Sequence, residues 1–401
     1  MKVAQINNLC GRGSTGKIAI GISELSNKTG IENKIFYFSK SSSLSNAVKI
    51  TNKPYIKFQA LKSRVLGNYG FNSRSSTRKL IKELDIFNPD IVHIHNIHAH
   101  NVHFEMLFNY LRRKKKKIIY TFHDCWALTG YCPHFAMARC EKWKSKCFCC
   151  PLYKKYSWFF DKSKTNYFRK KKALSDLDLT IVAPSNWLAD IVKESFLKEY
   201  PVKVIKNGID LQVFYPIESN MREEKKLCDK TIVLGVADMW GRSKGLDVFI
   251  ELSKRLSADF QIILVGVSQK VKKLLPKNII SLKRTQNQNE LARIYSMSNV
   301  FVNPTREEVL GLVNIEALAC GVPVVMFNTG GSPECIDSTC GTIVECDDID
   351  QLVNAISEIR QSNRFSKEDC IKRAKLFDKS DRIQEYIDLY KMCFESKKEI
   401  A

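Results

Sequence analysis

The chain has 401 residues and a formal net charge of +22. That length exceeds one ordinary hydrophobic core, so two α/β domains are expected. Its hydrophobic content of 44% is typical of a soluble globular protein, and no apolar run is long enough to cross a bilayer. The first residues are typical of a strand and not of a signal peptide, so a cytoplasmic location is expected.

The excess of positive charge includes two basic runs, at residues 112–117 and 169–172. A basic surface attracts polyanions, and the candidates are nucleic acid, anionic lipid headgroups and pyrophosphate-linked substrates. No recognised nucleic-acid module accompanies the charge, which disfavours nucleic acid. Peripheral contact with an anionic membrane is therefore expected, and a merely solvated basic surface is the alternative.

In chain order, the first half alternates short apolar strands with amphipathic helices. The expected strands are VAQINN, NKIFYF, DIVHIHN, KIIYTFH and LTIVAPS, and helices are expected to begin near residues 15, 102 and 186. Residues 41–76 are polar and show no clear pattern. Apolar strands separated by helices predict a parallel sheet that is covered on both faces.

The second half repeats this order after a charged link at residues 218–230. The expected strands are TIVLGVAD, QIILVGV, NIISLK, NVFVN and VPVVMF. The sequence therefore predicts two doubly wound, Rossmann-like domains facing a cleft, with a ligand at the carboxyl ends of their strands. The expected divisions are an N-terminal domain with a Cys-rich insert, a C-terminal domain and a final helix, at residues 1–205 (insert at about 125–151), 206–379 and 380–401.

The stretch from Glu308 to Glu316 carries the clearest functional pattern. It places two carboxylates eight residues apart, at the junction between a loop and an apolar helix expected over residues 311–320. Free backbone N–H groups at such a junction, together with the positive end of the helix dipole, suit a diphosphate. Carboxylates would repel phosphate but accept hydrogen bonds from hydroxyls. A diphosphate flanked by hydroxyl-rich groups is a nucleotide-sugar.

This stretch, with ALACGVPVV and TGGSPE behind it, resembles the paired-glutamate motif of the retaining glycosyltransferases of family 4, which have the GT-B fold. Val309 and Leu310 replace the Gly and Phe that are usual in the motif. The resemblance implies that Glu316 binds the ribose hydroxyls of the nucleotide and that Glu308 binds the sugar hydroxyls. It also implies that the final helix packs back on the N-terminal domain. The backbone N–H groups expected at the diphosphate are those of Gly311, Leu312 and Val313.

Two cations near residue 244 complete the donor site that the resemblance implies. The family usually places Arg and Lys five residues apart, where they neutralise the diphosphate as it leaves. Lys244 fits, but Met239 occupies the usual Arg position, so Arg242 is expected to supply the second cation. A lysine at a helix start opposes the helix dipole, which argues against a purely structural role for Lys244.

The run Gly11–Lys17 fits the spacing of a phosphate loop, G-x-x-x-x-G-K. Ile18 follows where a nucleotide hydrolase needs Ser or Thr to hold magnesium, which disfavours an ATPase. In the family that the chain resembles, a glycine turn after the first strand approaches the donor diphosphate or the acceptor. Gly13 and Gly16 match that turn, and the same residues are compatible with an ordinary helix start.

All seven histidines lie between residues 93 and 134, around the ends of two expected strands. Metal binding is one interpretation, but GT-B enzymes work without a catalytic metal, so polar residues that line the cleft are preferred and no catalytic cofactor is expected. By the resemblance, His123 and Asp124 in TFHDCW lie near the transferred sugar, which His123 orients. His98 in HNIHAH falls where related envelope enzymes have H-N-x-H-G, with Ala99 in place of the glycine.

Six of the 14 cysteines fall between residues 125 and 150. Four of them have the spacing C-x7-C-x6-C-x2-C, namely Cys132, Cys140, Cys147 and Cys150. Four thiolates can hold a structural zinc, and the closing C-x-x-C favours this interpretation. Reduced thiols without a metal are the alternative, whereas disulfides are disfavoured in a reducing cytoplasm.

Together these patterns predict a cytoplasmic, retaining, hexosyltransferase-type glycosyltransferase. It would move a sugar from a UDP-sugar or GDP-sugar to an acceptor hydroxyl, on a lipid-linked saccharide used for bacterial envelope polysaccharide such as lipopolysaccharide or capsule. A nucleotide-sugar epimerase or hydrolase would share the fold and the donor site. A phosphate-loop ATPase would depend on Gly11–Lys17, and a nucleic-acid-binding protein on the net charge alone.

Overall fold

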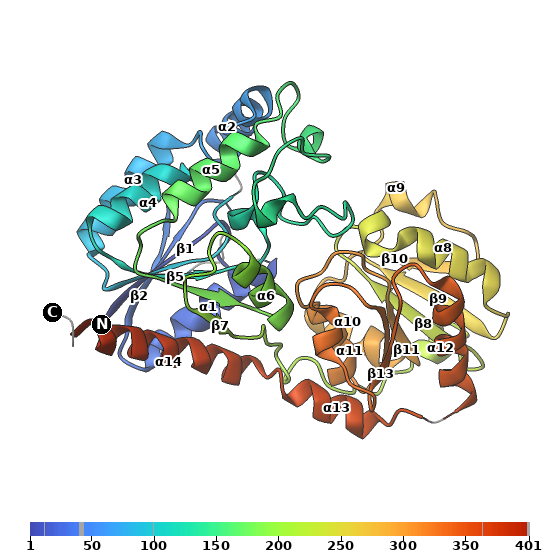
Figure 1. Cartoon of the computed structure of the whole chain (residues 1–401). Coiled ribbons are helices and arrows are strands. Elements are labelled where there is room, and N and C mark those ends of the chain that lie inside the picture. The colour runs from blue at the N-terminus through green and yellow to red at the C-terminus, as the bar shows by residue number, and fades with distance from the viewer. Residues whose placement is uncertain (12, 40–43, 99, 363, 399–401) are drawn as a thin grey trace. The chain divides into compact units, whose positions relative to one another are not determined.

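The computed structural model describes residues 1–11, 13–39, 44–98, 100–362 and 364–398 (Figure 1). Arg12 of the glycine run and Ala99 lie outside the described residues, as do residues 399–401 of the expected final helix. The chain divides into two compact units: unit 1 is Met1–Ile205 with Arg382–Ala401, and unit 2 is Lys206–Asp381. Among the described residues, no helix combines the length and the apolar character needed to cross a bilayer.

Within the described residues, unit 1 is built on seven parallel strands in the order β3-β2-β1-β4-β5-β6-β7. These strands are β1 (Lys2–Asn7), β2 (Glu32–Tyr37), β3 (Ala47–Lys49), β4 (Ile91–Ile94), β5 (Lys117–Thr121), β6 (Leu179–Ala183) and β7 (Val202–Val204). The helices of this part are α1 (Gly13–Lys28), α2 (Lys53–Leu66), α3 (Arg74–Phe87), α4 (Phe104–Arg113), α5 (Ser163–Ala173) and α6 (Asn186–Glu194). The last helix, α14 (Lys379–Lys398), returns to this unit.

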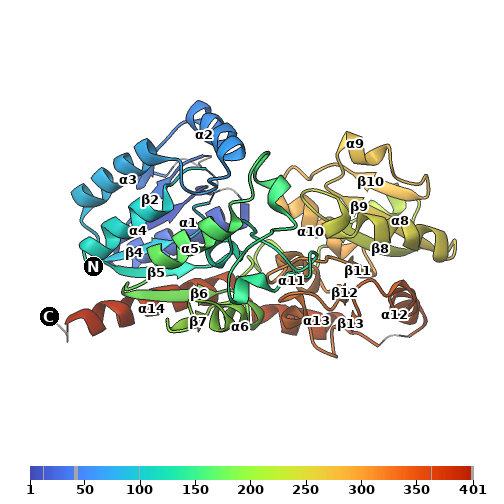
Figure 2. The same cartoon turned by 45° about the horizontal axis from the view of Figure 1, so that its top comes forward.

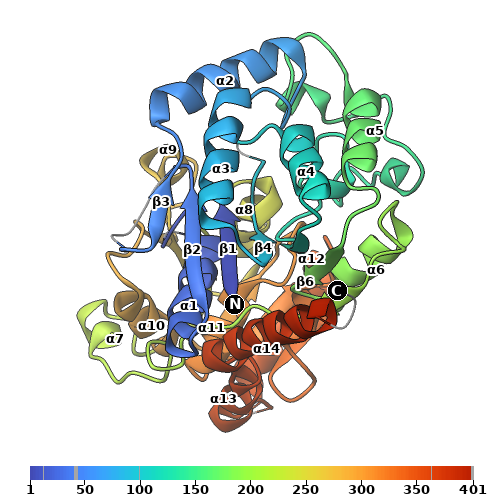
Figure 3. The ribbon, with the colours of Figure 1, turned by 90° about the vertical axis from the view of Figure 1, so that its left-hand side faces the viewer.

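Helices cover both faces of the first sheet. α1 and α14 lie on one face, and α3, α4 and α5 lie on the other (Figures 1 and 3). Ile383 and Ile387 of α14 pack with Ile91 of β4 in one buried core. Tyr390 of the same helix reaches His93, whose Nδ1 lies 2.6 Å from the tyrosine hydroxyl. Burial of these side chains holds α14 on the N-terminal sheet.

Within the described residues, unit 2 holds six parallel strands in the order β10-β9-β8-β11-β12-β13. These strands are β8 (Thr231–Val236), β9 (Phe260–Val265), β10 (Ile279–Leu282), β11 (Val300–Asn303), β12 (Val324–Phe327) and β13 (Gly341–Val344). The helices are α7 (Met221–Glu224), α8 (Leu246–Arg255), α9 (Gln269–Lys272), α10 (Gln288–Ser296), α11 (Leu312–Ala319), α12 (Ile349–Gln361) and α13 (Lys367–Lys375).

Alternation along the strands explains the two cores of unit 2. On β8, Ile232 and Leu234 belong to a core with α10, α11 and α13, whereas Val233 belongs to a core with α8 and α12. Figures 1 and 2 show α10 and α11 on one side of the sheet and α8 and α12 on the other. Since both faces of the central strands β8, β11 and β12 are buried, these strands are mostly apolar and do not alternate in sequence.

The prediction of two parallel α/β sheets is confirmed, and the differences are local. Residues 41–76, which show no clear pattern in sequence, contain β3, α2 and the first turn of α3. The helix expected from Lys244 begins only at Leu246, because Arg242–Lys244 form a 3-10 turn that ends at Gly245 in the left-handed conformation, with φ of 71°.

Candidate functional site

In unit 2, the side chains of Lys244 and Glu308 form an ion pair. Lys244 ends the 3-10 turn before α8, and Glu308 lies in the loop between β11 and α11. The Nζ atom of Lys244 is 2.6 Å from Oε2 of Glu308, and the two side chains are 35% and 24% exposed. The structure therefore brings together two predicted site residues that are 64 positions apart in the chain. Their partial exposure leaves both charges accessible to a ligand.

Backbone contacts hold the two loops that carry this ion pair. The Arg306 N–H and the Thr305 hydroxyl both donate to the carbonyl of Ser243, at 2.9 and 3.1 Å. On the other side, a Cβ placed on Gly330 would lie 1.9 Å from the carbonyl oxygen of Glu308. The φ of 58° at Gly330 also favours glycine. The glycine turn in TGGSPE therefore fixes the backbone that carries the Glu308 carboxylate.

The start of α11 presents backbone donors next to this loop. Gly311 occupies the N-cap with φ of 86°, and no side chain among the described residues caps the helix there. The first-turn N–H groups of Leu312 and Val313 therefore lack a capping partner. Glu316 lies one turn further along α11, and its Oε2 accepts a hydrogen bond from the hydroxyl of the buried Tyr295 at 3.1 Å. Uncapped N–H groups and a positioned carboxylate suit a ligand with an anionic and a hydroxyl-bearing part.

Arg242 shares the 3-10 turn with Lys244, but within the described part of the chain its guanidinium makes no polar contact. Its carbonyl accepts a hydrogen bond from the buried guanidinium of Arg306. Met239, which occupies the position of the usual family arginine, is 83% exposed. Lys244 is thus the cation that contacts Glu308, and the donor-binding role of Arg242 stays a prediction.

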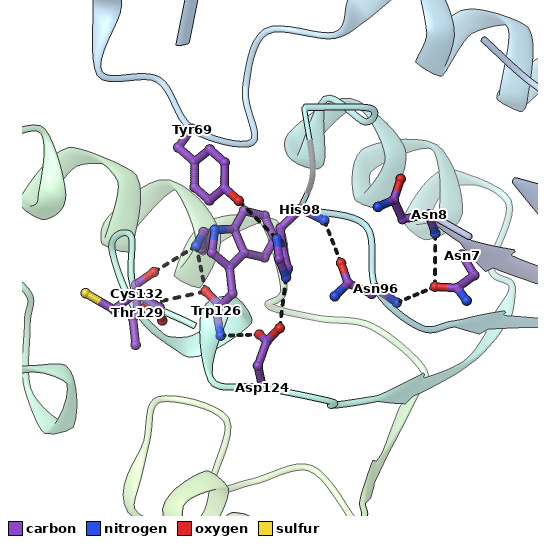
Figure 4. Close-up of polar contacts among 10 residues, drawn as sticks. Asn7, Asn8, Tyr69, Asn96, His98, Asp124, Trp126, Thr129 and Cys132 are labelled. Carbon is purple, nitrogen blue, oxygen red and sulfur yellow. Dashed lines mark hydrogen bonds and ion pairs between the residues drawn. The ribbon is translucent and has the colours of Figure 1, made fainter. Parts of the chain in front are cut away.

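In unit 1, polar side chains at the ends of β4 and β5 line a small hollow that is open to solvent. Nε2 of His98 is 2.8 Å from Oδ2 of Asp124, and Nδ1 of His98 is 3.0 Å from the hydroxyl of Tyr69 (Figure 4). The N–H of Trp126 donates to the other carboxylate oxygen of Asp124 at 2.8 Å. Burial alone would raise the pKa of Asp124, but His98 and the Trp126 N–H lower that pKa to about 2. Asp124 is therefore ionised at neutral pH and fixes the orientation of the His98 ring.

Three further histidines lie deeper in unit 1. Nε2 of His123 is 3.2 Å from Nδ1 of His95, whose Nε2 is 3.0 Å from Oε1 of Gln5. His93 lies on β4, two positions before His95, and each of its ring nitrogens contacts a hydroxyl. Burial lowers the pKa of His93 to about 3 and that of His123 to about 4. These rings are therefore neutral at pH 7, and His123 and His95 line the hollow without adding charge to it.

These pKa values predict that mild acid destabilises the protein. Unfolded histidine protonates near pH 6.5, whereas folded His93 and His123 stay neutral until about pH 3 and 4. The unfolded chain thus binds more protons, so the free energy of unfolding falls as the pH drops from about 6.5 toward about 4. The loss is up to about 1.4 kcal/mol per pH unit for each such histidine. Urea unfolding at about pH 7.5 and about pH 5 measures it.

The His93→Asn variant serves as the control for this pH dependence. It removes one buried histidine, so the difference in unfolding free energy between the two pH values should shrink. Asp124 does not contribute in this window, because its stabilising ionisation is lost only as the pH falls from about 3.9 toward about 2. Equal free energies of unfolding at both pH values in the wild-type chain would show that these rings are not buried and neutral.

Gly13 and Gly16 lie at the start of α1, after β1. Gly13 has φ of 67°, and the carbonyl of Gly16 accepts a hydrogen bond from the N–H of Gly11 at 3.1 Å. The helix thus begins four residues before Lys17. A phosphate loop needs an open backbone ahead of its lysine to surround the phosphates, so this helix start does not favour an ATPase.

The predicted zinc ligands all lie in the segment between β5 and α5. The Sγ atoms of Cys132 and Cys150 are 3.9 Å apart, and Cys147 accepts a hydrogen bond from the Gly130 N–H at 3.3 Å. Among the described residues, no three His, Cys, Asp or Glu side chains are already grouped closely enough to hold a metal ion. The zinc site stays a prediction.

The two basic runs are only partly exposed. The guanidinium of Arg112 donates to three backbone carbonyls at the end of α5 and just after it. Lys117 pairs with Asp178 at 2.7 Å, and Arg169 pairs with a carboxylate of α4. Lys170 is fully buried, and burial lowers its pKa well below the usual value. The exposed members of the runs are Arg113, Lys114, Lys115, Lys171 and Lys172, and their contact with a membrane stays a prediction.

Three residues that contact the candidate site residues carry no functional signal in the sequence. Tyr69 lies in a stretch without a clear pattern, and Lys170 stands in a basic run typical of solvated surface. Tyr295 follows the apolar spacing of α10 and is indistinguishable from a core aromatic. Their partners become apparent only in the folded chain.

Both units are parallel α/β folds, and doubly wound folds bind ligands at the carboxyl ends of their strands. The Lys244–Glu308 pair and the His98–Asp124 pair lie in loops that follow strands. Comparisons with known proteins show the family. A family model described as glycosyl transferases group 1 matches residues 217–377, and one described as glycosyltransferase family 4 matches residues 23–213. The two models cover most of both units. The chain belongs to the glycosyltransferases of family 4 and is an enzyme of the hexosyltransferase type.

Two relatives in sequence and one solved structure with a similar fold are the following. The chain is 26% identical over 324 residues to an uncharacterized 41.2 kDa protein in the cps region of Klebsiella pneumoniae, covering 78% of this chain and 81% of that protein. It is 28% identical over 187 residues to a GDP-mannose-dependent monoacylated alpha-(1-6)-phosphatidylinositol monomannoside mannosyltransferase of Corynebacterium glutamicum, over 42% of this chain and 49% of the relative. The fold matches HepE of Anabaena in complex with UDP and glucose, with a TM-score of 0.69, 16% identity and coverage of 98% and 100%.

Proposed function

We propose that this glycosyltransferase moves a sugar from a UDP-sugar or GDP-sugar to an acceptor hydroxyl with retention of anomeric configuration. The main support for this proposal is the Lys244–Glu308 ion pair, which lies in the loops next to the uncapped start of α11. Glu316 takes the ribose hydroxyls and Glu308 the sugar hydroxyls, while Lys244 and the N–H groups of Leu312 and Val313 take the diphosphate. Relatives named with UDP and glucose and with GDP-mannose support either nucleotide.

In the proposed reaction, the bond from the anomeric carbon to the diphosphate oxygen breaks and a bond to the acceptor oxygen forms. The leaving phosphate oxygen takes the acceptor proton, so no protein nucleophile is needed. Charge on the leaving diphosphate is stabilised by the Lys244 ammonium and the α11 N–H groups, and the proposal requires no catalytic metal. Neutral His123 orients the sugar, and the His98–Asp124 pair contacts the acceptor.

The proposed acceptor is a lipid-linked saccharide for envelope polysaccharide, reached from the cytoplasmic face of the membrane. The relative from a cps region supports this class of pathway. Trp158, Phe159 and Phe160 are 50%, 65% and 53% exposed, and the Trp158 N–H donates to the carbonyl of Arg64 at the end of α2. The ammonium of Lys162 lies 5.8 Å from the centre of the Phe160 ring. Exposed aromatic side chains next to lysines suit an anionic membrane surface.

Replacing Trp158, Phe159 and Phe160 together by Ser should therefore weaken binding to anionic vesicles. Partial burial of three aromatic rings contributes several kcal/mol at most, and a loss of about tenfold or more is expected. Cosedimentation with vesicles of phosphatidylglycerol and phosphatidylcholine measures the effect. Leu376→Ser, which removes another exposed apolar side chain in unit 2, is the matched control and should bind normally. If the triple variant binds vesicles as tightly as the wild type, these three aromatic residues do not contact the membrane.

The function itself is tested by thermal unfolding in the presence of UDP, GDP, ADP, ATP and CMP. A ligand that binds only the folded chain stabilises it by about 2.7 kcal/mol at about 100 times its dissociation constant. A shift with UDP or GDP is expected, and Glu316→Ala should diminish it. A shift only with ATP or ADP that is lost in Lys17→Ala would indicate that the protein is an ATPase and not a transferase. Donor consumption with no acceptor present would instead indicate an epimerase or hydrolase.

A further inference from the structure

The segment that connects β5 to α5 is long and has little regular structure. Between Phe122 and Lys162 the described chain contains only 3-10 turns, at Trp126–Leu128, Lys142–Lys144 and Tyr153–Lys155. Connections of this length without helices or strands are uncommon in compact domains. This one nevertheless carries Asp124 and Trp126 of the His98 site, so its conformation has to be held in place.

The sulfur atoms of this segment lie at a spacing that suits a shared metal ion. The Sγ atoms of Cys132 and Cys150 are 3.9 Å apart. Zinc with four Zn–S bonds of about 2.3 Å at tetrahedral angles places its sulfurs about 3.8 Å apart, whereas a disulfide requires about 2.05 Å. Cys140 and Cys147 of the same segment complete the cysteine cluster of the sequence motif. Of these four thiols, Cys132 and Cys150 already stand at the spacing of zinc ligands.

The backbone around the cluster favours thiolates. The Gly130 N–H donates to Sγ of Cys147 at 3.3 Å. Such N–H···S hydrogen bonds stabilise the anionic form of sulfur, which is the form that binds metal. Cys149, between two ligands of the cluster, has φ of 43° and turns the chain there. Its side chain is exposed, which separates Cys149 from the cluster.

A buried lysine ties the segment to α5. The Nζ atom of Lys170 donates to the carbonyls of Trp126 and Thr129, at 2.6 and 2.9 Å, and lies 3.5 Å from the centre of the Trp126 ring. These contacts hold the start of the segment, at residues 126–129, on the buried face of α5. The cysteines that follow lie beyond this anchored part.

We propose that Cys132, Cys140, Cys147 and Cys150 bind one structural Zn²⁺, and that this centre fixes the segment that holds Trp126 and Asp124 beside His98. On binding, the thiol protons leave to solvent and four Zn–S bonds form. Cys132 and Cys150 already stand at the ligand spacing, and Cys140 and Cys147 have to approach them, because the described side chains do not yet form a group of three ligands. The proposed zinc holds the segment in place and takes no part in the transfer chemistry.

The test is the zinc content of the full chain, purified with a reductant and without a chelator. About one zinc per chain, measured by mass spectrometry after gel filtration, is expected. Cys132→Ser and Cys150→Ser should each lose it. Cys149→Ser, an exposed cysteine of the same segment, is the matched control and should keep it. Less than about a tenth of this content in the wild-type chain, or unchanged zinc in Cys150→Ser, would overturn the proposal.

A second measurement covers serine variants that fail to fold. The wild-type chain is stripped with a chelator and titrated with Co²⁺, which in a four-thiolate site gives intense thiolate-to-metal charge-transfer bands and tetrahedral ligand-field bands. One equivalent of Co²⁺ should produce both, and the same titration should raise the thermal stability of the apo chain. Octahedral spectra without charge transfer, or a Cys132–Cys150 disulfide in the reduced preparation, would overturn the site.

Discussion

Lys244→Ala is expected to lower kcat by about 100- to 1,000-fold and to leave the protein folded. Without ligand, the Lys244 ammonium lies 2.6 Å from the carboxylate of Glu308. In the proposed reaction it faces charge that develops only as the diphosphate departs, and loss of one such prepositioned donor costs about 10²–10³ in rate. The measurement is the steady-state release of nucleotide, with a thermal unfolding curve for each variant.

The matched control for this variant is Lys254→Ala. Lys254 is also a lysine paired with a glutamate, with Nζ 3.1 Å from Oε2 of Glu251, but the pair lies on the outer surface of α8. Exposed pairs of this kind contribute at most about 1 kcal/mol to stability, so the control should keep its activity and its fold. A near-normal kcat in Lys244→Ala would show that Lys244 does not stabilise the leaving diphosphate.

Glu316→Ala is expected to weaken the binding of the free nucleotide by about 10- to 100-fold. Hydrogen bonds to a charged group contribute about 1.5–3 kcal/mol, and each 1.4 kcal/mol is about tenfold in affinity. In the structure, the carboxylate is held by the Tyr295 hydroxyl at 3.1 Å, so it is positioned before the ligand arrives. Calorimetric titration with UDP or GDP measures the loss, since these ligands carry the ribose but lack the sugar that is transferred.

Two further variants separate the roles of the paired glutamates. Glu308→Ala should weaken the binding of the nucleotide-sugar but leave the binding of the free nucleotide nearly unchanged. Tyr295→Phe removes the hydroxyl that positions Glu316 while keeping the ring in the core, so its loss in affinity should be smaller than that of Glu316→Ala. If Glu316→Ala binds nucleotide as tightly as the wild type, the assignment of the ribose hydroxyls to Glu316 is wrong.

Most of the fold could be predicted because the central strands of both sheets are buried on two faces and appear as apolar runs. α2 could not, since its apolar residues do not mark a single buried face. Phe58 and Leu61 of this helix are 60% and 51% exposed, while Gln59 and Ser63 are buried. The helix is set by its ends instead, with Asn52 accepting the Tyr55 N–H at 3.0 Å at the start.

The candidate site was predictable where its residues form a local pattern, as Glu308 and Glu316 do around a helix start. Contacts between distant positions were not. Nothing in the sequence of Arg169–Lys172 separates Lys170 from its neighbours, yet Lys170 is buried and Lys171 is exposed. Lys170 is buried because it lies on the face of α5 that packs on Trp126. Charged residues are rarely buried so completely, so the sequence alone does not predict this burial.

Transfer of a sugar from a nucleotide donor with retention is tested by its product. The enzyme is incubated with a labelled α-linked UDP-sugar or GDP-sugar, with and without a lipid extract that contains lipid-linked saccharides. We expect label to enter the lipid fraction only when the extract is present, and the new bond to have the α configuration by nuclear magnetic resonance. Donor consumed equally without the extract, or a product with the β configuration, would contradict this expectation.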